Sequence, residues 1–138
     1  MTMEPAKWHW WHDAEENPPE DWVHAFDEAT SDIGTAVRGL EAAIYIARTR
    51  KRTGKGPTFS ELFRAVGPDP RNLEPLPRTI SSVERNRVVG QFRMSIAHAW
   101  GRAGWIAWGK ETHSLRVGPR FRAAARRHRT TKTSIEHM

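Results

Sequence analysis

The first helical pattern in the chain runs from Glu20 to about Arg50. Its hydrophobic residues recur at spacings of three, four and seven positions, which is typical of an amphipathic helix. The triplet Thr30-Ser31-Asp32 could cap a second helix, so the pattern fits either one long helix or two helices with a kink near Ser31. The hydrophobic residues form a stripe along one face, which could pack in the protein's own core or, alternatively, form the seam of a homodimer. The residues of that seam are Phe26, Ile33, Val37, Leu40 and Ile44.

A short helix is predicted to begin after Thr58. Glu61 stands three residues beyond it, which is the spacing of a capping box, and apolar positions continue to Val66. The run Gly67-Pro68-Asp69-Pro70 ends the helix. The Pro-rich segment that follows, as far as Pro77, is expected to form an ordered loop.

A longer helix is predicted over about residues 82–102, where Ser81 and Glu84 again have capping-box spacing. One face gathers Val89, Phe92, Ile96, Ala99, Trp100 and Ala103. Arg93, at the flank of this face, could be an internal ion-pair partner. The opposite face could read base edges or simply face solvent. Its residues are Arg87, Gln91, Met94, Ser95, His98 and Arg102.

The periodicity changes towards two directly after Gly104. Residues 105–108 and 114–117 therefore read as two short strands, and the Gly-containing segment 109–113 joins them as a hairpin loop. Residues 121–128 are expected to add one or two basic helical turns, and residues 129–138 a loose tail. Residues 1–19 lack periodicity and read as an arm, so the predicted folded domain covers residues 20–128.

Charge is divided very unevenly along the chain. Residues 1–33 hold nine acidic residues against Lys7, a net charge of −8, whereas residues 34–138 hold 21 basic and seven acidic residues, a net charge of +14. Such a basic region attracts polyanions, of which nucleic acid is the commonest. Arginine supplies 17 of the 22 basic residues, which suits bidentate contacts to phosphate and guanine, although GC-rich genomes also favour arginine.

The N-terminal arm carries Trp8, Trp10 and Trp11, which are expected to dock on the protein's own core or on a second subunit. His9, His12 and Asp13 are metal-ligating residue types, but no distant fourth ligand accompanies them, so we expect no metal site. Residues 1–33, which include this arm, could fold back on the basic region and compete with DNA, or their carboxylates could only keep the tryptophans soluble.

Several function classes are disfavoured. The chain has no cysteine, so it has neither disulfides nor a catalytic thiol, and no apolar run is long enough for a membrane span. The N-terminus does not resemble a signal peptide, so a cytoplasmic protein is expected. The seven histidines are dispersed without a catalytic triad spacing, and we predict no enzymatic activity and no cofactor.

The order of elements resembles the winged helix-turn-helix superfamily. The most specific stretch is residues 97–108, Ala-His-Ala-Trp-Gly-Arg-Ala-Gly-Trp-Ile-Ala-Trp. It is similar to the end of a recognition helix and the first wing strand of MarR- or PadR-like regulators. The resemblance covers about residues 58–117. It departs from the family in the 14-residue segment from Gly67 to Ile80 and in the length of the helix that follows.

The resemblance implies a mainly α fold, a winged helix-turn-helix with a long N-terminal helix and one β-hairpin wing. It also implies a sequence-specific transcriptional regulator of double-stranded DNA, with helix 82–102 in the major groove and Arg85, Arg87 and Gln91 at base edges. The residues expected along phosphates are Lys110, Arg116, Arg120, Arg122, Arg126, Arg127 and Arg129. The alternative function is an adaptor that binds a transcription or replication complex through the Trp-rich arm.

Overall fold

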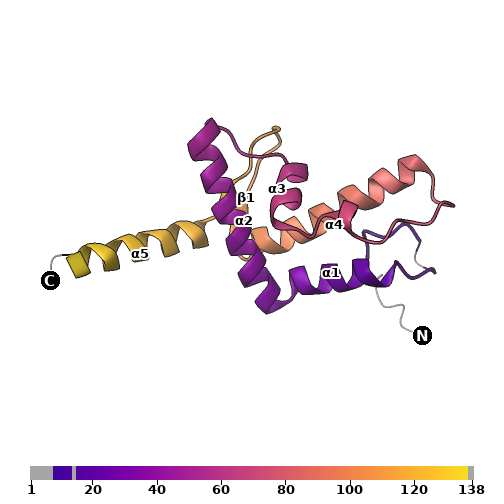
Figure 1. Ribbon diagram of the computed structural model, residues 1–138, viewed down its shortest axis with the longest axis horizontal. Coiled ribbons are helices and arrows are strands. Elements are labelled where there is room, and N and C mark those ends of the chain that lie inside the picture. Colours follow the sequence, from indigo (N-terminus) through magenta and orange to yellow (C-terminus); the bar gives the residue numbers. More distant parts are fainter. Residues whose placement is uncertain (1–7, 14, 137–138) are drawn as a thin grey trace.

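The structure, a computed structural model, describes residues 8–13 and 15–136, with side chains as far as residue 127. This part of the chain is mainly helical, with a small two-stranded antiparallel sheet (Figure 1). Its mainly α class and hairpin are therefore confirmed, and the winged helix-turn-helix arrangement stays a prediction. The elements are α1 (Glu20–Thr30), α2 (Asp32–Thr53), α3 (Phe59–Val66), the 3-10 turn η1 (Pro70–Asn72), α4 (Ser82–Arg102), β1 (Ile106–Ala107), β2 (Arg116–Val117) and α5 (Pro119–Glu136).

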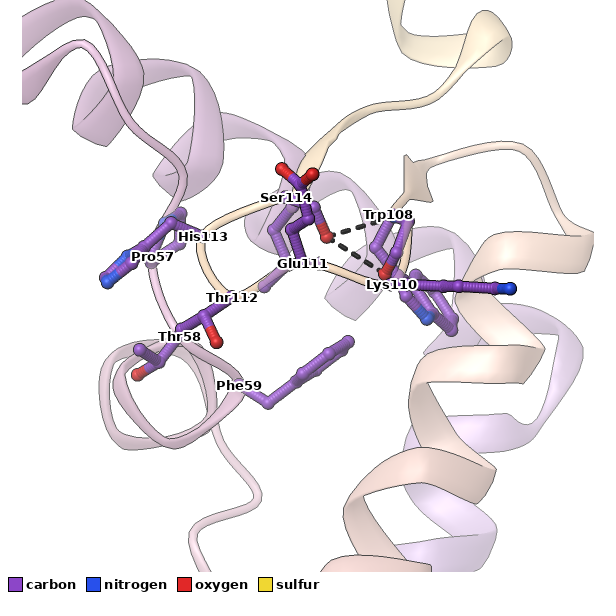
Figure 2. Close-up of a pocket in the computed structure, with 11 residues that line it drawn as sticks. Pro57, Thr58, Phe59, Trp108, Lys110, Glu111, Thr112, His113 and Ser114 are labelled. Atoms are coloured by element: carbon purple, nitrogen blue, oxygen red, sulfur yellow. Dashed lines mark hydrogen bonds between the residues drawn. The ribbon is translucent and has the colours of Figure 1, made fainter.

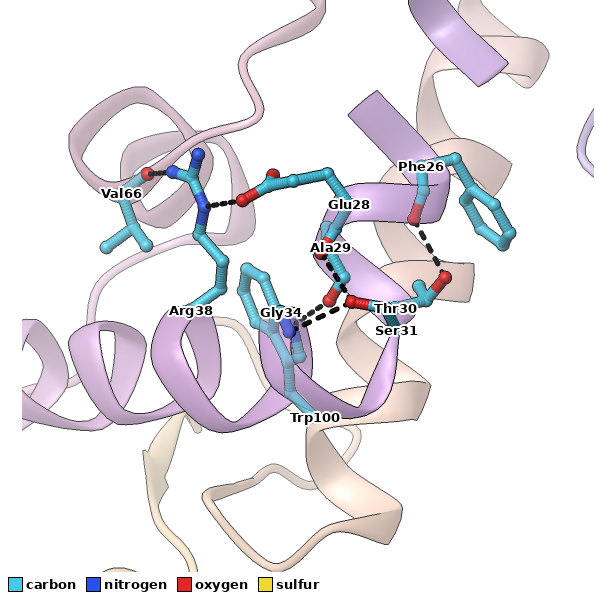
Figure 3. Close-up of polar contacts among 9 residues, drawn as sticks. All are labelled: Phe26, Glu28, Ala29, Thr30, Ser31, Gly34, Arg38, Val66 and Trp100. Atoms are coloured by element: carbon cyan, nitrogen blue, oxygen red, sulfur yellow. Dashed lines mark hydrogen bonds and ion pairs between the residues drawn. The ribbon is translucent and has the colours of Figure 1, made fainter. Parts of the chain in front are cut away.

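The first helical pattern forms two helices, which is the second of the two alternatives. Ser31 separates them, and its hydroxyl caps α2 by accepting a hydrogen bond from the amide of Gly34 at 2.9 Å. A Cβ on Gly34 would collide with the carbonyl of Glu28, so this tight turn requires glycine. The indole of Trp100 donates to the carbonyl of Ala29 at 3.0 Å and fixes α4 against the junction (Figure 3).

A single arginine ties α3 to the same junction. Arg38 of α2 donates to the carbonyl of Val66 at 2.7 Å and to the carboxylate of Glu28 at 3.2 Å (Figure 3). Val66 is the last residue of α3, so the guanidinium satisfies a carbonyl that the helix end leaves free. α2 thereby connects α1 and α3.

The capping box predicted for α3 is present. The hydroxyl of Thr58 accepts from the amide of Glu61 at 3.1 Å, and the Glu61 carboxylate accepts from the amide of Thr58 at 3.1 Å. The backbone hydrogen bond from Thr58, followed by the side-chain bond, lowers the pKa of Glu61 below its ordinary value. The helix ends at Gly67, whose φ of 76° lies in the left-handed region that favours glycine.

α4 has the predicted limits, and its buried face is centred on Phe92, Ile96 and Trp100 as predicted. One residue of the opposite face was assigned wrongly, because Ser95 is buried. His9 of the N-terminal arm covers it, with its Nε2 at 2.8 Å from the Ser95 hydroxyl. A contact between residues so far apart in sequence leaves no mark in the periodicity of α4.

The tryptophans of the arm dock on the protein's own core, one of the two alternatives left by the sequence. Trp10 and Trp11 are buried, and the Trp10 ring lies 6.2 Å from Trp22, 5.6 Å from Phe26 and 5.0 Å from Phe92 between ring centroids. We call Trp10, Trp22, Phe26 and Phe92 the aromatic core. The described part of the arm is thus packed into the domain, and a boundary at residue 19 does not separate the two.

The predicted homodimer seam does not form one face. Phe26 lies on α1 within the aromatic core, because the break at Ser31 turns α1 away from α2. Ile33, Val37 and Leu40 of α2 are 79%, 50% and 37% exposed, and Ile44 is half-buried. Only the α2 part of the stripe therefore remains an uncovered apolar surface.

The hairpin is shorter than predicted, and the helix after it is longer. Ile106 pairs with Val117 and Ala107 with Arg116 in an antiparallel register. α5 begins at Pro119 and runs to Glu136, so the described residues from 129 are helical and the prediction of a loose tail is wrong. The segment has good helix formers and a proline at its first position, where proline is tolerated. In Figure 1, α5 points away from the body formed by the other helices.

Candidate nucleic-acid interface

The loop of the hairpin is held against the C-terminal end of α2. Arg50 donates through Nε to the carbonyl of Leu115 at 2.6 Å and through Nη2 to that of His113 at 3.4 Å. The amide of Gly56 also donates to the His113 carbonyl at 3.2 Å, and the carbonyl of Gly56 lies 2.8 Å from Nδ1 of His113. These contacts fix the hairpin relative to the basic segment that follows α2.

The two segments that these contacts join both carry exposed cations. The hairpin contributes Lys110 and Arg116, which were expected at phosphates and are both exposed. The end of α2 and the loop after it contribute exposed cations that were not among the residues predicted to contact DNA. Glu111 is the acidic residue of the hairpin loop. We call the following set the cationic edge: Arg48, Lys51, Arg52, Lys55, Lys110 and Arg116.

A hollow of about 310 Å³ lies between the hairpin loop and the start of α3 (Figure 2). Phe59 of α3 contacts Trp108 edge to face, with ring centroids 5.3 Å apart. The Ser114 hydroxyl closes the loop by accepting from the amide of Gly109 at 3.0 Å and donating to its carbonyl at 3.1 Å. Figure 2 shows Lys110 pointing away from Phe59, so the ammonium group is directed outwards.

The exposed side of α4 leads from the N-terminal arm to the hairpin. Arg87 and Gln91 are exposed and line a hollow of about 160 Å³ together with His9 and His12 of the arm. Further along, His98 contacts the ring of Trp108 at 5.2 Å between centroids. Two of the predicted base-contacting residues, Arg87 and Gln91, therefore share a side of α4, and Arg87 also pairs with Glu84 at 3.7 Å.

Arg85 lies apart from the other two predicted base-contacting residues. It donates to the carbonyl of Ile80 at 3.1 Å and lines a different hollow, beside Trp22 and Leu76. Residues two positions apart on a helix point to different sides, which explains the separation from Arg87. The structure does not bring the three predicted residues together.

The arginines of α5 are spread along the projecting helix. Arg120 stacks over the ring of Trp105, with its guanidinium carbon 4.9 Å from the ring centroid. Arg122, Arg126 and Arg127 are exposed, whereas the side chain of Arg129 lies outside the described residues. Because α5 leaves the body beyond β2, these groups extend the charge of the hairpin region rather than joining Arg87.

Within the described part of the chain, no group of three or more histidine, aspartate or glutamate side chains could hold a metal ion. None of the helices among those residues combines the length and apolar character needed to cross a membrane. In the described part of the arm, Nε2 of His12 lies 3.5 Å from the carboxylate of Glu16.

Comparison of the chain with protein-family models, with curated proteins and with solved structures finds no match.

Proposed function

We propose that this protein binds double-stranded DNA and regulates transcription by doing so in a sequence-dependent way. The observation that carries the proposal is the cationic edge, whose exposed cations stand on the end of α2 and on the hairpin, two segments that Arg50 joins. Clustered positive charge on one surface is the electrostatic footprint of nucleic-acid binding. The winged helix-turn-helix resemblance supports the same class of function.

The two kinds of DNA contact would come from different elements. Lys110 and Arg116, with the cations at the end of α2, would lie along phosphates and supply affinity without sequence choice. Arg87 and Gln91 of α4 would meet base edges in the major groove, where arginine pairs with guanine and glutamine with adenine. We leave Arg85 out of this set, because it lines another hollow.

Binding to a random duplex tests the phosphate contacts. We expect affinity to fall steeply with salt, and Lys110→Ala together with Arg116→Ala to reduce the slope of log K against log salt by about 2. Arg78→Ala is the matched control, since Arg78 is exposed in the loop before α4. Weak binding at low salt, or a slope that the hairpin substitutions leave unchanged, would refute the proposal.

Selection of bound duplexes from a random pool tests sequence choice. Arg87→Ala should relax the sequence preference at one base pair, where the arginine contributes a discrimination of about 1–3 kcal/mol. Arg116→Ala should weaken binding to all duplexes alike. If no motif is enriched, the protein is a non-specific DNA binder.

The burial of two arm tryptophans argues against the adaptor alternative. Trp10 and Trp11 are 1% and 9% exposed, so they are core side chains rather than a surface for a partner. Hot-spot tryptophans at interfaces need to be accessible before binding.

We also propose a homodimer, through the exposed face of α2 alone. Ile33, Val37 and Leu40 are the large apolar side chains on this face. Asp32 lies at the start of α2 and Arg48 and the basic residues after it at the end, so two antiparallel copies would set opposite charges near each other.

A further inference from the structure

Trp108, which directly follows β1, differs in its placement from most tryptophans of the chain. Five of the seven tryptophans are buried in the core, whereas Trp108 is half-buried. Phe59 of α3 contacts its ring at 5.3 Å and His98 of α4 contacts it at 5.2 Å, both measured between ring centroids. The indole is therefore held in place by two neighbouring rings and still has accessible surface.

This accessible surface borders two hollows. One is the hollow beside the hairpin loop, which Lys110 also lines. The other has a volume of about 440 Å³, is open to solvent and lies between the end of α4 and β1, and we call it the α4–β1 hollow. Among the described residues that line the α4–β1 hollow there is no carboxylate. They are His98, Gly101, Arg102, Ile106, Ala107 and Trp108.

The polar side chains of the α4–β1 hollow are accessible. His98 and Arg102 stand one turn apart on α4, and both are exposed. Arg102 forms no ion pair within the described residues, although Asp32 shares another hollow with it. Arg93 of the same helix also lacks an ion pair there, contrary to the sequence expectation, but it is half-buried and lines a different hollow. Arg102 is therefore the accessible cation that α4 carries beside Trp108.

We propose that the α4–β1 hollow binds one unpaired nucleotide of a DNA strand, with the base against the indole of Trp108 and the phosphate on Arg102. A base inside a duplex is stacked between its neighbours, so an unstacked base is the one that offers its face to an aromatic side chain. Aromatic rings beside positive charge are the features by which proteins hold single strands. The volume of the hollow lies within the range of about 300–1,000 Å³ that is usual for small-ligand sites.

This subsite rests on the proposed DNA binding. Trp108 also borders the hollow that Lys110 lines, and Lys110 is expected to contact phosphates of the duplex. A strand that leaves the duplex at the hairpin would therefore reach Trp108 directly. The subsite adds to duplex binding a preference for DNA with an unpaired end.

Three duplexes that differ only at one end test this preference. The first is blunt, the second continues into a short run of unpaired thymidines, and the third continues into the same number of abasic nucleotides. The abasic overhang keeps the phosphates and lacks the bases, so it separates stacking from charge. Fluorescence anisotropy should show that the thymidine overhang binds about fivefold or more tightly than the abasic overhang, because only the thymidines can stack on the indole.

The blunt duplex distinguishes failure of the subsite from failure of the proposed function. Equal affinities for the two overhangs, with the blunt duplex still bound, would overturn the subsite alone. If the blunt duplex is not bound at low salt, the proposed function fails. The subsite is then tested by the same comparison between single strands of thymidine and of abasic nucleotides, where equal affinities would overturn it as well.

Two substitutions assign the contacts. Trp108→Leu should abolish the preference for thymidine over abasic overhangs, because leucine is apolar but has no ring. Tyr45→Leu is the matched control, since Tyr45 is a half-buried aromatic residue of α2 that lines neither hollow, and it should keep the preference. Arg102→Gln should weaken both overhang duplexes by a similar factor and also keep the preference. A preference that survives in folded Trp108→Leu would overturn the assignment.

Photocrosslinking of the wild-type protein decides if Trp108→Leu does not fold. The overhang then carries 5-iodouracil in place of thymine, and mass spectrometry identifies the residue that becomes attached on irradiation. We expect attachment at Trp108 or His98, the two rings of the α4–β1 hollow. Attachment confined to other residues would overturn the subsite.

Discussion

The aromatic core draws its rings from segments far apart in the sequence, whereas the cationic edge draws its charges from two segments held together by backbone contacts. Trp10, Trp22 and Phe92 come from the arm, α1 and α4, and all three are at most 2% exposed. The cations of the cationic edge are exposed. Arg50 joins the two segments that carry them by donating hydrogen bonds to the carbonyls of Leu115 and His113. Burial supplies stability in the first region, and accessible charge would supply the proposed DNA binding in the second.

The two regions should therefore respond to different substitutions. Removing a buried ring loses its transfer free energy and leaves a cavity, while DNA affinity of the remaining folded protein stays intact. Removing an exposed cation changes the salt dependence of binding and leaves stability almost unchanged, because surface substitutions usually alter it by less than about 0.5 kcal/mol.

The largest expected effect is that of Trp10→Ala. The Trp10 ring is 1% exposed and contacts Trp22, Phe26 and Phe92, so truncation should lower the free energy of unfolding by about 3–5 kcal/mol. Urea denaturation followed by circular dichroism measures the change.

Val83→Ala is the control for this substitution, because Val83 is 80% exposed on α4. It should change the free energy of unfolding by less than about 0.5 kcal/mol. If Trp10→Ala were equally mild, the arm would be a dispensable attachment and the boundary at residue 19 would be restored.

The sequence was informative wherever local chemistry decides the structure. α3 and α4 begin where Thr58 and Ser81 predicted, because a side-chain cap acts on amides two or three residues away. The hairpin follows Gly104 as the change of period indicated. α5 was underestimated although its signal was present: Pro119 at the first position is followed by no further glycine or proline before Glu136.

Contacts between distant segments could not be predicted in the same way. The sequence of α4 does not indicate that His9 covers Ser95. The hydrophobic pattern of the first two helices likewise does not indicate that Phe26 faces the core while Ile33 faces solvent. The candidate interface shows the same limit. Lys110 and Arg116 were identified as cations of a hairpin, but their proximity to the end of α2 depends on Arg50 reaching Leu115, 65 residues away.

The second prediction concerns α2, which contributes to the body of the protein and carries an uncovered apolar face. If two copies pair through this face, Leu40→Glu should weaken dimerisation at least tenfold, because it places a charge in an apolar seam. Light scattering over a concentration series measures the change. Val83→Glu is the matched control, since it charges an exposed valine on another helix.

Circular dichroism of Leu40→Glu separates the two roles of the stripe. A folded monomer agrees with a seam, and an unfolded chain would show that Leu40 belongs to the core. A wild-type protein that is monomeric throughout the series would remove the dimer altogether.

The third prediction concerns the turn η1 after α3, where Arg71 donates hydrogen bonds to the nearly buried Asp69. These bonds hold the pKa of Asp69 below its ordinary value, so the unfolded state binds a proton more readily. The resulting stabilisation is complete above the unfolded pKa and is lost as pH falls through the folded pKa. Asp69→Asn should therefore lower Tm at pH 7, and its difference from wild type should shrink below about pH 4. A difference from wild type that does not change with pH would contradict this assignment.

The smallest effect is expected where the acidic arm lies beside the side of α4 that carries Arg87 and Gln91. Removing the whole arm would also remove Trp10 from the core, so the charge is tested by Glu15→Gln with Glu16→Gln, both exposed positions. If the arm competes with DNA, this double variant should bind a random duplex about two- to threefold more tightly at low salt. The gap should close as salt rises, since charges are screened over about 8 Å at physiological ionic strength.

The matched control for the arm is Asp27→Asn with Glu74→Gln, which removes the same charge from exposed positions outside it. An equal gain in both double variants would assign the effect to net charge rather than to the place of the arm beside α4. If the arm variant binds DNA with unchanged affinity at every salt concentration, the carboxylates of the arm do not compete with DNA. They would then only keep in solution a segment whose tryptophans are buried. In either case the aromatic core, and not the charge of the arm, would be what holds residues 8–13 against α4.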